Sequence, residues 1–311
     1  MSRYKEVDLF QIHVNSVKDR PSKVETGSLA TASGNFLDSV PDILKGADFK
    51  ELVQRCRNAI SSHKPIIAAL GGHVIKCGLA PLLIRLMEAG AVKCFAVNGS
   101  VTIHDFELAF YGKTSEDVST GLKDGTFGMV FETTHGINSV ITQASDAELG
   151  FGEALGKHIL ENAPHPESSL LAMAYKHGIP VTAHIALGTD ITHQTPCADG
   201  KAIGDCSLRD FRIFCEQVKD LNGGGVYLNL GSAVLLPEVF LKALTVARNL
   251  YGQVQDFTTA VFDMNMHYRC LENVVRRPVE NGGKGYYFIG HHELMIPLLV
   301  QEILAEKPAR D

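Results

Sequence analysis

Residues 66–73 read Ile66-Ile67-Ala68-Ala69-Leu70-Gly71-Gly72-His73, an apolar run followed directly by two glycines and a histidine. A short apolar run between Pro65 and a Gly-Gly pair is typical of a buried β-strand. The next segment carries leucine or methionine at positions 79, 82, 83, 86 and 87, which is the spacing of one helix face. This stretch therefore predicts a strand, a glycine turn and a helix.

The same alternation continues along the chain. We expect further strands at residues 94–97, 181–187, 226–230, 258–262 and 286–289, and helices at 49–60, 168–177, 207–221, 235–251 and 293–306. Strands that alternate with helices of this length indicate an α/β fold, a mostly parallel sheet with helices on both faces. We expect residues 65–311 to form a single domain, with residues 1–64 as an N-terminal extension that packs on it.

Composition narrows the class of protein. The 311 residues are 45% hydrophobic and 21% charged, which is globular, and the formal net charge of −6 argues against a nucleic-acid partner. The charged N-terminus leads into no apolar segment, and Arg85 and Glu88 interrupt the most apolar stretch, so we expect no signal peptide and no membrane segment. The seven cysteines are scattered without a C-x-x-C pair. We therefore expect a cytoplasmic protein with reduced thiols.

Polar residues follow every predicted strand. In open parallel sheets, ligands bind outside the carboxyl ends of the strands, so we predict a cleft there. Along the chain these strand ends hold Gly72 and His73; Asn98, Gly99, His104 and Asp105; Thr189, Asp190 and His193; Gly231 and Ser232; Asp263 and His267; and His291, His292 and Glu293. The histidines are candidates for acid/base groups that titrate near neutrality.

The glycines at the strand ends have two interpretations. A tight turn needs a residue that tolerates positive φ, and backbone amides that approach a phosphate also need glycine. The G-x-G-x-x-G fingerprint of dinucleotide-binding proteins is absent. The nearest string, with glycines at positions 150, 152 and 156, follows a helical segment, and we interpret it as structural.

A metal site is a further possibility for the histidines, with Asp105, Asp190, Asp263 and Glu293 nearby in the sequence. No H-E-x-x-H or similar ligand spacing occurs, so a metal site would have to be assembled from distant strand ends. We therefore predict none.

Two long polar segments lack periodicity. Residues 189–206 form one predicted loop, and such loops in compact domains are usually functional or mobile. Residues 267–285 form the other, with Arg269, Arg276, Arg277 and Lys284. This second segment is either a solvated basic loop or a clamp for a carboxylate or phosphate.

From about Lys64 onward, the order of motifs resembles the deoxyhypusine synthase family. Residues 71–76 take the place of that family's first nucleotide-binding loop, and residues 97–105 resemble its Thr-Ala-Gly-Gly turn. Residues 174–181 are similar to its helix-to-strand stretch, Thr189-Asp190 to its cofactor-contacting Thr-Asp-Gly, and residues 223–226 to the glycine run before its active-site lysine. The resemblance implies a deoxyhypusine synthase-like NAD-binding fold, bound NAD, and a homotetramer with sites between subunits.

The departures from the family bear on its chemistry. Where the family has its imine-forming lysine, this chain reads Val226-Tyr227-Leu228-Asn229. The family's acidic polyamine-binding segment is replaced by Asp-Met-Asn-Met-His at 263–267, and no acidic pocket for a polycation is evident. Covalent transfer through an enzyme imine needs an amine nucleophile. We therefore do not expect deoxyhypusine synthesis.

Residues 98–107 also resemble the NAD-binding domain of the ornithine cyclodeaminases related to arginine dihydrolase. Those enzymes oxidise the amine of an amino acid with tightly bound NAD, lose ammonia and return the hydride. This chemistry needs an acid/base group and a carboxylate anchor, but no lysine imine.

These arguments predict an NAD-dependent enzyme, of transferase or of ammonia-lyase (cyclodeaminase) type. It would use NAD as a recycled hydride carrier on a small amine or amino acid. The predicted cofactor-binding residues are Gly72, His73, Asn98, Gly99, Thr189, Asp190, Gly231 and Ser232, with Lys76 as a phosphate contact. The predicted acid/base candidates are His104, Asp105, His193, His267 and His292. Two alternatives stay open: a metal-dependent hydrolase that uses the strand-end His, Asp and Glu residues, and a non-catalytic NAD-binding sensor.

Overall fold

A computed structural model describes residue 30 and residues 36–305, and the chain divides into two compact units, residues 1–50 and 51–311. In the first unit, the ring of Phe36 on α1 (Phe36–Ser39) meets the ring of Phe49 edge-on, with 6.3 Å between centroids. Phe49 belongs to α2 (Leu44–Ser61), which confirms the helix predicted at 49–60. About half of the predicted extension, residues 1–64, lies outside the described residues, and its boundary stays a prediction.

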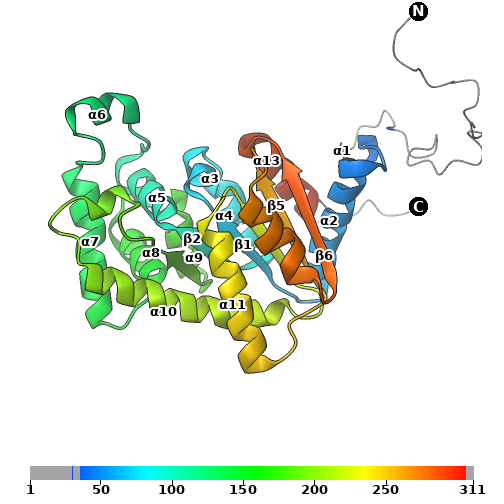
Figure 1. The fold of residues 1–311 in the computed structure, drawn as a ribbon. Coiled ribbons are helices and arrows are strands. Elements are labelled where there is room, and N and C mark those ends of the chain that lie inside the picture. Colours follow the sequence, from blue (N-terminus) through cyan, green and yellow to red (C-terminus); the bar gives the residue numbers. More distant parts are fainter. Residues whose placement is uncertain (1–29, 31–35, 306–311) are drawn as a thin grey trace, which may run out of the picture. The chain divides into compact units, whose positions relative to one another are not determined.

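The second unit is built on one six-stranded sheet in which every pairing is parallel (Figure 1). Its strands are β1 (Ile66–Leu70), β2 (Val92–Asn98), β3 (Val181–His184), β4 (Val226–Leu230), β5 (Phe257–Asp263) and β6 (Gly283–Ile289). They lie in the order β3-β2-β1-β4-β5-β6. The chain thus builds outward from β1 to one edge and then returns to build from β4 to the other. The order reverses between β1 and β4, and we call this place the switch point.

Helices cover both faces of the sheet. The helices of this unit are α3 (Gly72–Lys76), α4 (Ala80–Glu88), α5 (Gly99–Tyr111), α6 (Val118–Asp124), α7 (Phe131–Asp146), α8 (Phe151–Asn162), α9 (Leu170–Lys176), α10 (Gly200–Val218), α11 (Leu235–Tyr251), α12 (Tyr268–Cys270) and α13 (His292–Leu304). The α10 and α11 helices pack on one face, and α4, α9 and α13 pack on the other. The predicted α/β class with a parallel sheet is confirmed. None of the described helices combines the length and the apolar character that crossing a membrane requires.

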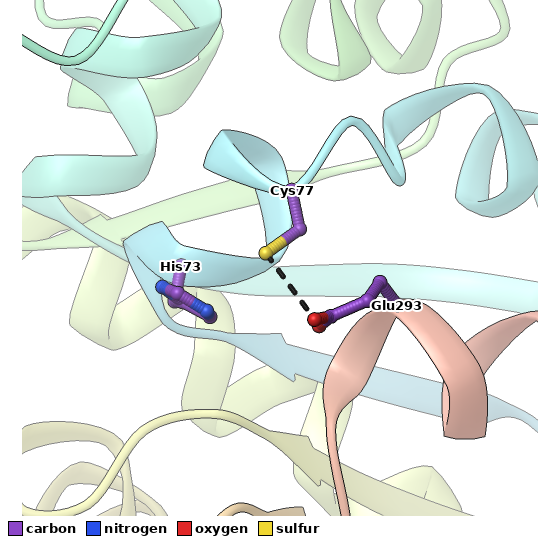
Figure 2. A group of neighbouring side chains, drawn as sticks. All are labelled: His73, Cys77 and Glu293. Carbon is purple, nitrogen blue, oxygen red and sulfur yellow. Dashed lines mark hydrogen bonds between the residues drawn. The ribbon is translucent and has the colours of Figure 1, made fainter.

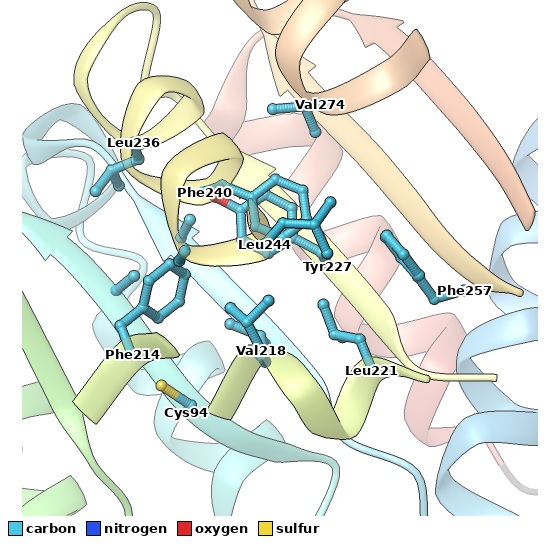
Figure 3. Packing of buried hydrophobic residues seen from close by; sticks show 14 of the residues in the cluster. Cys94, Phe214, Val218, Leu221, Tyr227, Leu236, Phe240, Leu244, Phe257 and Val274 are labelled. Atoms are coloured by element: carbon cyan, nitrogen blue, oxygen red, sulfur yellow. The ribbon is translucent and has the colours of Figure 1, made fainter. Parts of the chain in front are cut away.

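The larger core lies between the sheet and the α10–α11 pair (Figure 3). The Tyr227 ring of β4 stacks on the Phe240 ring of α11, with 3.7 Å between centroids and 6° between planes. Phe214 and Val218 of α10 join the same cluster and are fully buried. Because the opposite face is covered as well, the central strands β1 and β4 are buried along their whole length, and β1 reads as a continuous apolar run. The edge strand β6, by contrast, begins with exposed Gly283 and Lys284.

Both predicted loops contain regular structure, so these two predictions are wrong. Within 189–206, a 3-10 turn covers Ile191–His193, and α10 already begins at Gly200. The Asp199 carboxylate caps α10 by accepting hydrogen bonds from the amides of Lys201 (2.8 Å) and Ala202 (3.2 Å). Within 267–285, α12 leads into a π-helix (Leu271–Arg276) and a 3-10 turn (Arg277–Val279), and β6 begins at Gly283. The strand predicted at 181–187 ends at His184.

The glycines at 150, 152 and 156 serve packing, as interpreted from the sequence. Gly150 is the N-cap of α8. A Cβ on Gly152 would lie 2.0 Å from the carbonyl oxygen of Val181, and one on Gly156 would lie 2.6 Å from that of Leu171. These glycines let α8 approach β3 and α9 closely.

Candidate active site

The carboxyl ends of β1 and β4 meet backbone to backbone at the switch point. The Gly71 amide donates to the carbonyl oxygen of Leu230 at 2.9 Å. A Cβ on Gly71 would lie 2.0 Å from the carbonyl oxygen of Gly231, and one on Gly231 would lie 2.9 Å from Nε2 of His292. Gly231 also has φ of +71°, which L side chains rarely adopt. The fold thus brings the predicted residues after β1, β4 and β6 into one place.

His292 is a neutral imidazole at this place. Its side chain is 1% exposed, and its ring centroid lies 5.6 Å from that of His73. Burial lowers its pKa below the ordinary value for histidine. Nε2 lies 3.2 Å from the carbonyl oxygen of Phe262, which can only accept, so the proton belongs on Nε2. Nδ1 is then a buried acceptor, and it has no hydrogen-bond partner.

The ends of β2 and β3 adjoin the same edge of the sheet. The Asn98 side chain caps α5 by accepting a hydrogen bond from the amide of Val101 at 3.2 Å. A Cβ on Gly99 would lie 2.0 Å from Oδ2 of Asp190, and one on Gly72 would lie 2.2 Å from Oγ of Ser100. The Asp190 carboxyl therefore lies against the start of α5, and that start lies against the β1 turn. Burial raises the pKa of Asp190.

These contacts form one continuous line along the carboxyl ends of the strands, which we call the carboxyl edge. It contains six of the predicted cofactor-binding residues, namely Gly72, His73, Asn98, Gly99, Asp190 and Gly231. The remaining two make local contacts. The exposed Thr189 hydroxyl donates to the carbonyl of Ala186 at 2.7 Å, and the buried Ser232 hydroxyl accepts from the amide of Leu236 at 3.2 Å.

His104 lies on α5, between groups of opposite charge. Its Nδ1 is 2.7 Å from the Thr114 hydroxyl, which donates to Oε2 of Glu107 at 2.5 Å. Burial lowers the pKa of His104, Glu107 opposes that shift, and nearby Lys76 and His73 reinforce it. Because the Thr114 proton goes to Glu107, Nδ1–H of His104 donates to Thr114. Nε2 is consequently the nitrogen with a free lone pair.

A cavity of about 490 Å³ adjoins this relay. Glu107, Glu116 and Glu132 line it, together with Tyr111, and we call it the acidic cavity. Burial, Glu132 and Glu107 raise the pKa of Tyr111. The sequence gives no sign of an acidic pocket, because these carboxylates come from α5, the segment after it and α7. The available signal was the i, i+3, i+7 spacing of residues 104, 107 and 111 along one face of α5.

The remaining acid/base candidates have local partners. The fully buried Asp105 accepts hydrogen bonds from the Ser169 hydroxyl and from the amides of Leu170 (2.8 Å) and Leu171 (3.1 Å) at the start of α9. Burial raises the pKa of Asp105 to about 6, against the opposing effect of these hydrogen bonds. Asp105 therefore links α5 to the start of α9. The sequence had suggested this residue as an acid/base group, whereas its contacts here are structural.

Two predicted histidines are engaged within their own loops. Nδ1 of His193 accepts from the amides of Gly188 (3.1 Å) and Asp190 (3.3 Å), which holds the turn that carries the Asp190 carboxyl. His267 places Nε2 3.3 Å from Oδ1 of Asp263 at the end of β5. His193 therefore positions a neighbour, and His267 is paired with a carboxylate.

No family model and no curated protein matches this sequence. Among solved structures, ArgZ, an arginine dihydrolase from cyanobacteria, matches 83% of this chain at 16% identity with a TM-score of 0.50. AgrE in its ternary complex with ornithine and NAD+ matches 83% at 14% identity with a TM-score of 0.52. A putative deoxyhypusine synthase from Entamoeba histolytica matches 83% of this chain and 87% of its own at 9% identity, with a TM-score of 0.49.

The strand order β3-β2-β1-β4-β5-β6 defines a class, the doubly wound α/β folds. Within that class, the chain shares its fold with ArgZ and AgrE. It spans only 32% of the length of either protein. Membership of the deoxyhypusine synthase family stays a prediction.

Proposed function

We propose that this protein is an NAD-dependent enzyme that acts on a small amine or amino acid and uses NAD as a recycled hydride carrier. One observation carries the proposal: His104 is influenced electrostatically both by His73 and Lys76, at the switch-point edge with its glycine turns, and by Glu107, which lines the acidic cavity. The AgrE structure with ornithine and NAD+ shares this fold and supports the choice of ligands.

The carboxyl edge fits a dinucleotide. Glycines stand where the strand ends meet, so backbone groups can approach a ligand closely, and the start of α5 supplies amides for a phosphate. The half-buried Asp190 carboxyl suits ribose hydroxyls, and the unpartnered Nδ1 of His292 is a buried acceptor in need of a donor. When bound, NAD would supply the site for hydride transfer.

The acidic cavity fits the substrate's ammonium group. Three carboxylates attract a cation, and Lys113 on the same wall is available to a substrate carboxylate. His104 supplies the base. Its lowered pKa keeps the ring neutral at pH 7, and the Thr114–Glu107 relay holds the proton on Nδ1. Nε2 is then free to accept a proton from the substrate amine.

The first experiment is to denature the purified protein and identify released nucleotides by mass spectrometry, followed by calorimetric titration of the ligand-free chain with NAD. The proposal predicts NAD binding that Asp190→Asn weakens and Asp199→Asn, a helix-cap carboxylate outside the edge, leaves unchanged. Amino acids and diamines are then screened for ammonia release. Absence of NAD binding would falsify the proposal, whereas binding without turnover of any amine would favour the sensor. The cytoplasmic location and the homotetramer stay predictions.

A further inference from the structure

A second group of side chains lies at the carboxyl edge, and it shares His73 with the predicted cofactor-binding residues. Among the residues that the structure describes, His73, Cys77 and Glu293 bring an imidazole nitrogen, a thiol sulfur and a carboxylate oxygen within 4.8 Å of one another. Figure 2 shows the three side chains turned toward a common space, two from α3 and its C-terminal cap and one from the first turn of α13. The β1 and β6 ends of the sheet thus contribute to one cluster.

The spacing of these atoms is close to that of metal ligands. Sγ of Cys77 lies 3.9 Å from Oε2 of Glu293. Ligands at roughly 2.3 Å (sulfur) and roughly 2.0 Å (oxygen) from a tetrahedral zinc ion lie about 3.5 Å apart. Small side-chain rotations therefore suffice to close the set around an ion. Within residues 36–305, the His73 ring contacts the His292 ring and takes part in no hydrogen bond, so its nitrogens are available.

We propose that His73, Cys77 and Glu293 bind one zinc ion through imidazole nitrogen, thiolate sulfur and carboxylate oxygen. Sulfur and imidazole ligands select late transition metals such as zinc, whereas magnesium and calcium require oxygen sets. Three protein ligands leave one tetrahedral position for water or another ligand, as in open rather than closed structural sites.

This inference replaces the sequence-based prediction of no metal. His73 and Cys77 form an H-x-x-x-C pair on α3 and its C-terminal cap, and Glu293 follows 216 residues after Cys77. No local sequence motif therefore indicates this set of ligands. The zinc proposal shares His73 with the predicted cofactor site, but zinc binding is measured without NAD. The competing explanation is a plain hydrogen bond from the Cys77 thiol to Glu293, with no ion involved.

Metal binding by the full-length protein separates these explanations. The protein is stripped with a chelator and titrated with Zn²⁺ against a chromophoric competitor, and Co²⁺ is added to a second sample. We expect one equivalent of zinc, and with Co²⁺ a thiolate-to-metal charge-transfer band in the near ultraviolet. Cys77→Ser abolishes that band, and His73→Ala and Cys77→Ser each weaken zinc binding by at least about 10-fold.

Matched controls use a partly buried cysteine and an exposed histidine outside the cluster, Cys197→Ser and His135→Ala, which should bind zinc as the parent does. Glu293→Gln, at an exposed position, keeps the test open if a helix α3 variant fails to fold.

Zinc affinity unchanged in Cys77→Ser, or a Co²⁺ spectrum without the charge-transfer band, would overturn the inference. NAD binding is measured on the same samples, so that the two proposals are tested separately. Zinc binding without NAD binding would contradict only the proposed NAD-dependent function, and NAD binding without zinc binding would contradict only the zinc site.

Discussion

At the scale of the residue, the chain uses buried carboxyls to hold backbone together. Asp105 binds the start of α9, and Asp210 on α10 accepts hydrogen bonds from the amides of Gly152 (2.9 Å) and Ala183 (2.7 Å). The sequence could mark Asp105 as polar and close to a strand end. It could not show which face of α5 the residue occupies, because that depends on where α9 packs. The sequence indicated Asp210 only as part of a Ser207-x-x-Asp210 capping pattern, because its actual partners lie more than 25 residues away in the chain.

The pH dependence of stability tests the Asp210 environment. Burial raises its pKa from 3.8 to about 7, so the folded state retains a proton that the unfolded state releases. This group's stabilising contribution is therefore full below about pH 4 and is lost as pH rises toward about 7. We expect Asp210→Asn to lose less stability than the parent between pH 4.5 and pH 8, by on the order of a few kcal/mol. Urea unfolding at both pH values measures this, and equal pH dependence in the two proteins would refute it.

His104 carries the second prediction at this scale. Under the proposed function, His104→Ala lowers turnover by about 10²–10⁴-fold and leaves NAD affinity unchanged. His158→Ala, which also removes a partly buried helical histidine of lowered pKa, should retain activity. Because only the neutral ring accepts a proton, the parent's rate should fall as pH drops below the lowered pKa of His104. Steady-state kinetics across pH decide the matter, and an active His104→Ala enzyme removes the residue from the mechanism.

At the scale of the element, the inner strands were predictable because both faces of the sheet are covered there and the strand sequences are largely apolar. The carboxyl edge was predictable for a different reason, because the residues that follow parallel strands lie at the same edge of a sheet. Helices α5 to α8 were not individually predicted, because Thr, Ser and Gly dilute their apolar pattern. The acidic cavity depends on how α5 and α7 pack, so it was missed with them.

Two glycine substitutions test how tightly the elements pack. In Gly152→Ala, the new methyl group meets the Val181 carbonyl oxygen, and we expect destabilisation of about 1–3 kcal/mol or more. In Gly204→Ala, within α10, a Cβ meets nothing within 4 Å, and the helix should gain about 0.5–1 kcal/mol. Denaturant midpoints of the two variants should therefore move in opposite directions. Movement in the same direction would show that the α8–β3 contact is looser than described.

At the scale of the whole molecule, the formal net charge of −6 and the acidic cavity act together. Both favour the approach of cations, and the three cavity carboxylates concentrate cations locally. Residues 97–105 resemble a nucleotide-binding turn, but nothing in their sequence indicates this field, which arises only once distant carboxylates are gathered by the fold.

Ionic strength tests that field. For a cationic amine substrate, kcat/KM should fall as salt rises, because screening weakens long-range attraction. Glu132→Gln on the cavity wall should raise KM and flatten the salt dependence, whereas Glu161→Gln, an exposed carboxylate on α8, should do neither. Initial rates at several salt concentrations provide the measurement. Identical salt dependence in all three proteins would place the substrate elsewhere.

The backbone contact between Gly71 and Gly231 has a consequence for how this protein can diversify. Neither glycine tolerates a side chain, because one on Gly71 would meet the carbonyl oxygen of Gly231 and one on Gly231, at positive φ, would meet the His292 ring. A single-site change at either position therefore destabilises the fold, in nature as in a laboratory library. New substrate specificity therefore has to come from positions away from these two glycines, along the wall of the acidic cavity formed by α5, the segment after it and α7. A library confined to that wall should yield altered substrate preference while leaving the scaffold intact.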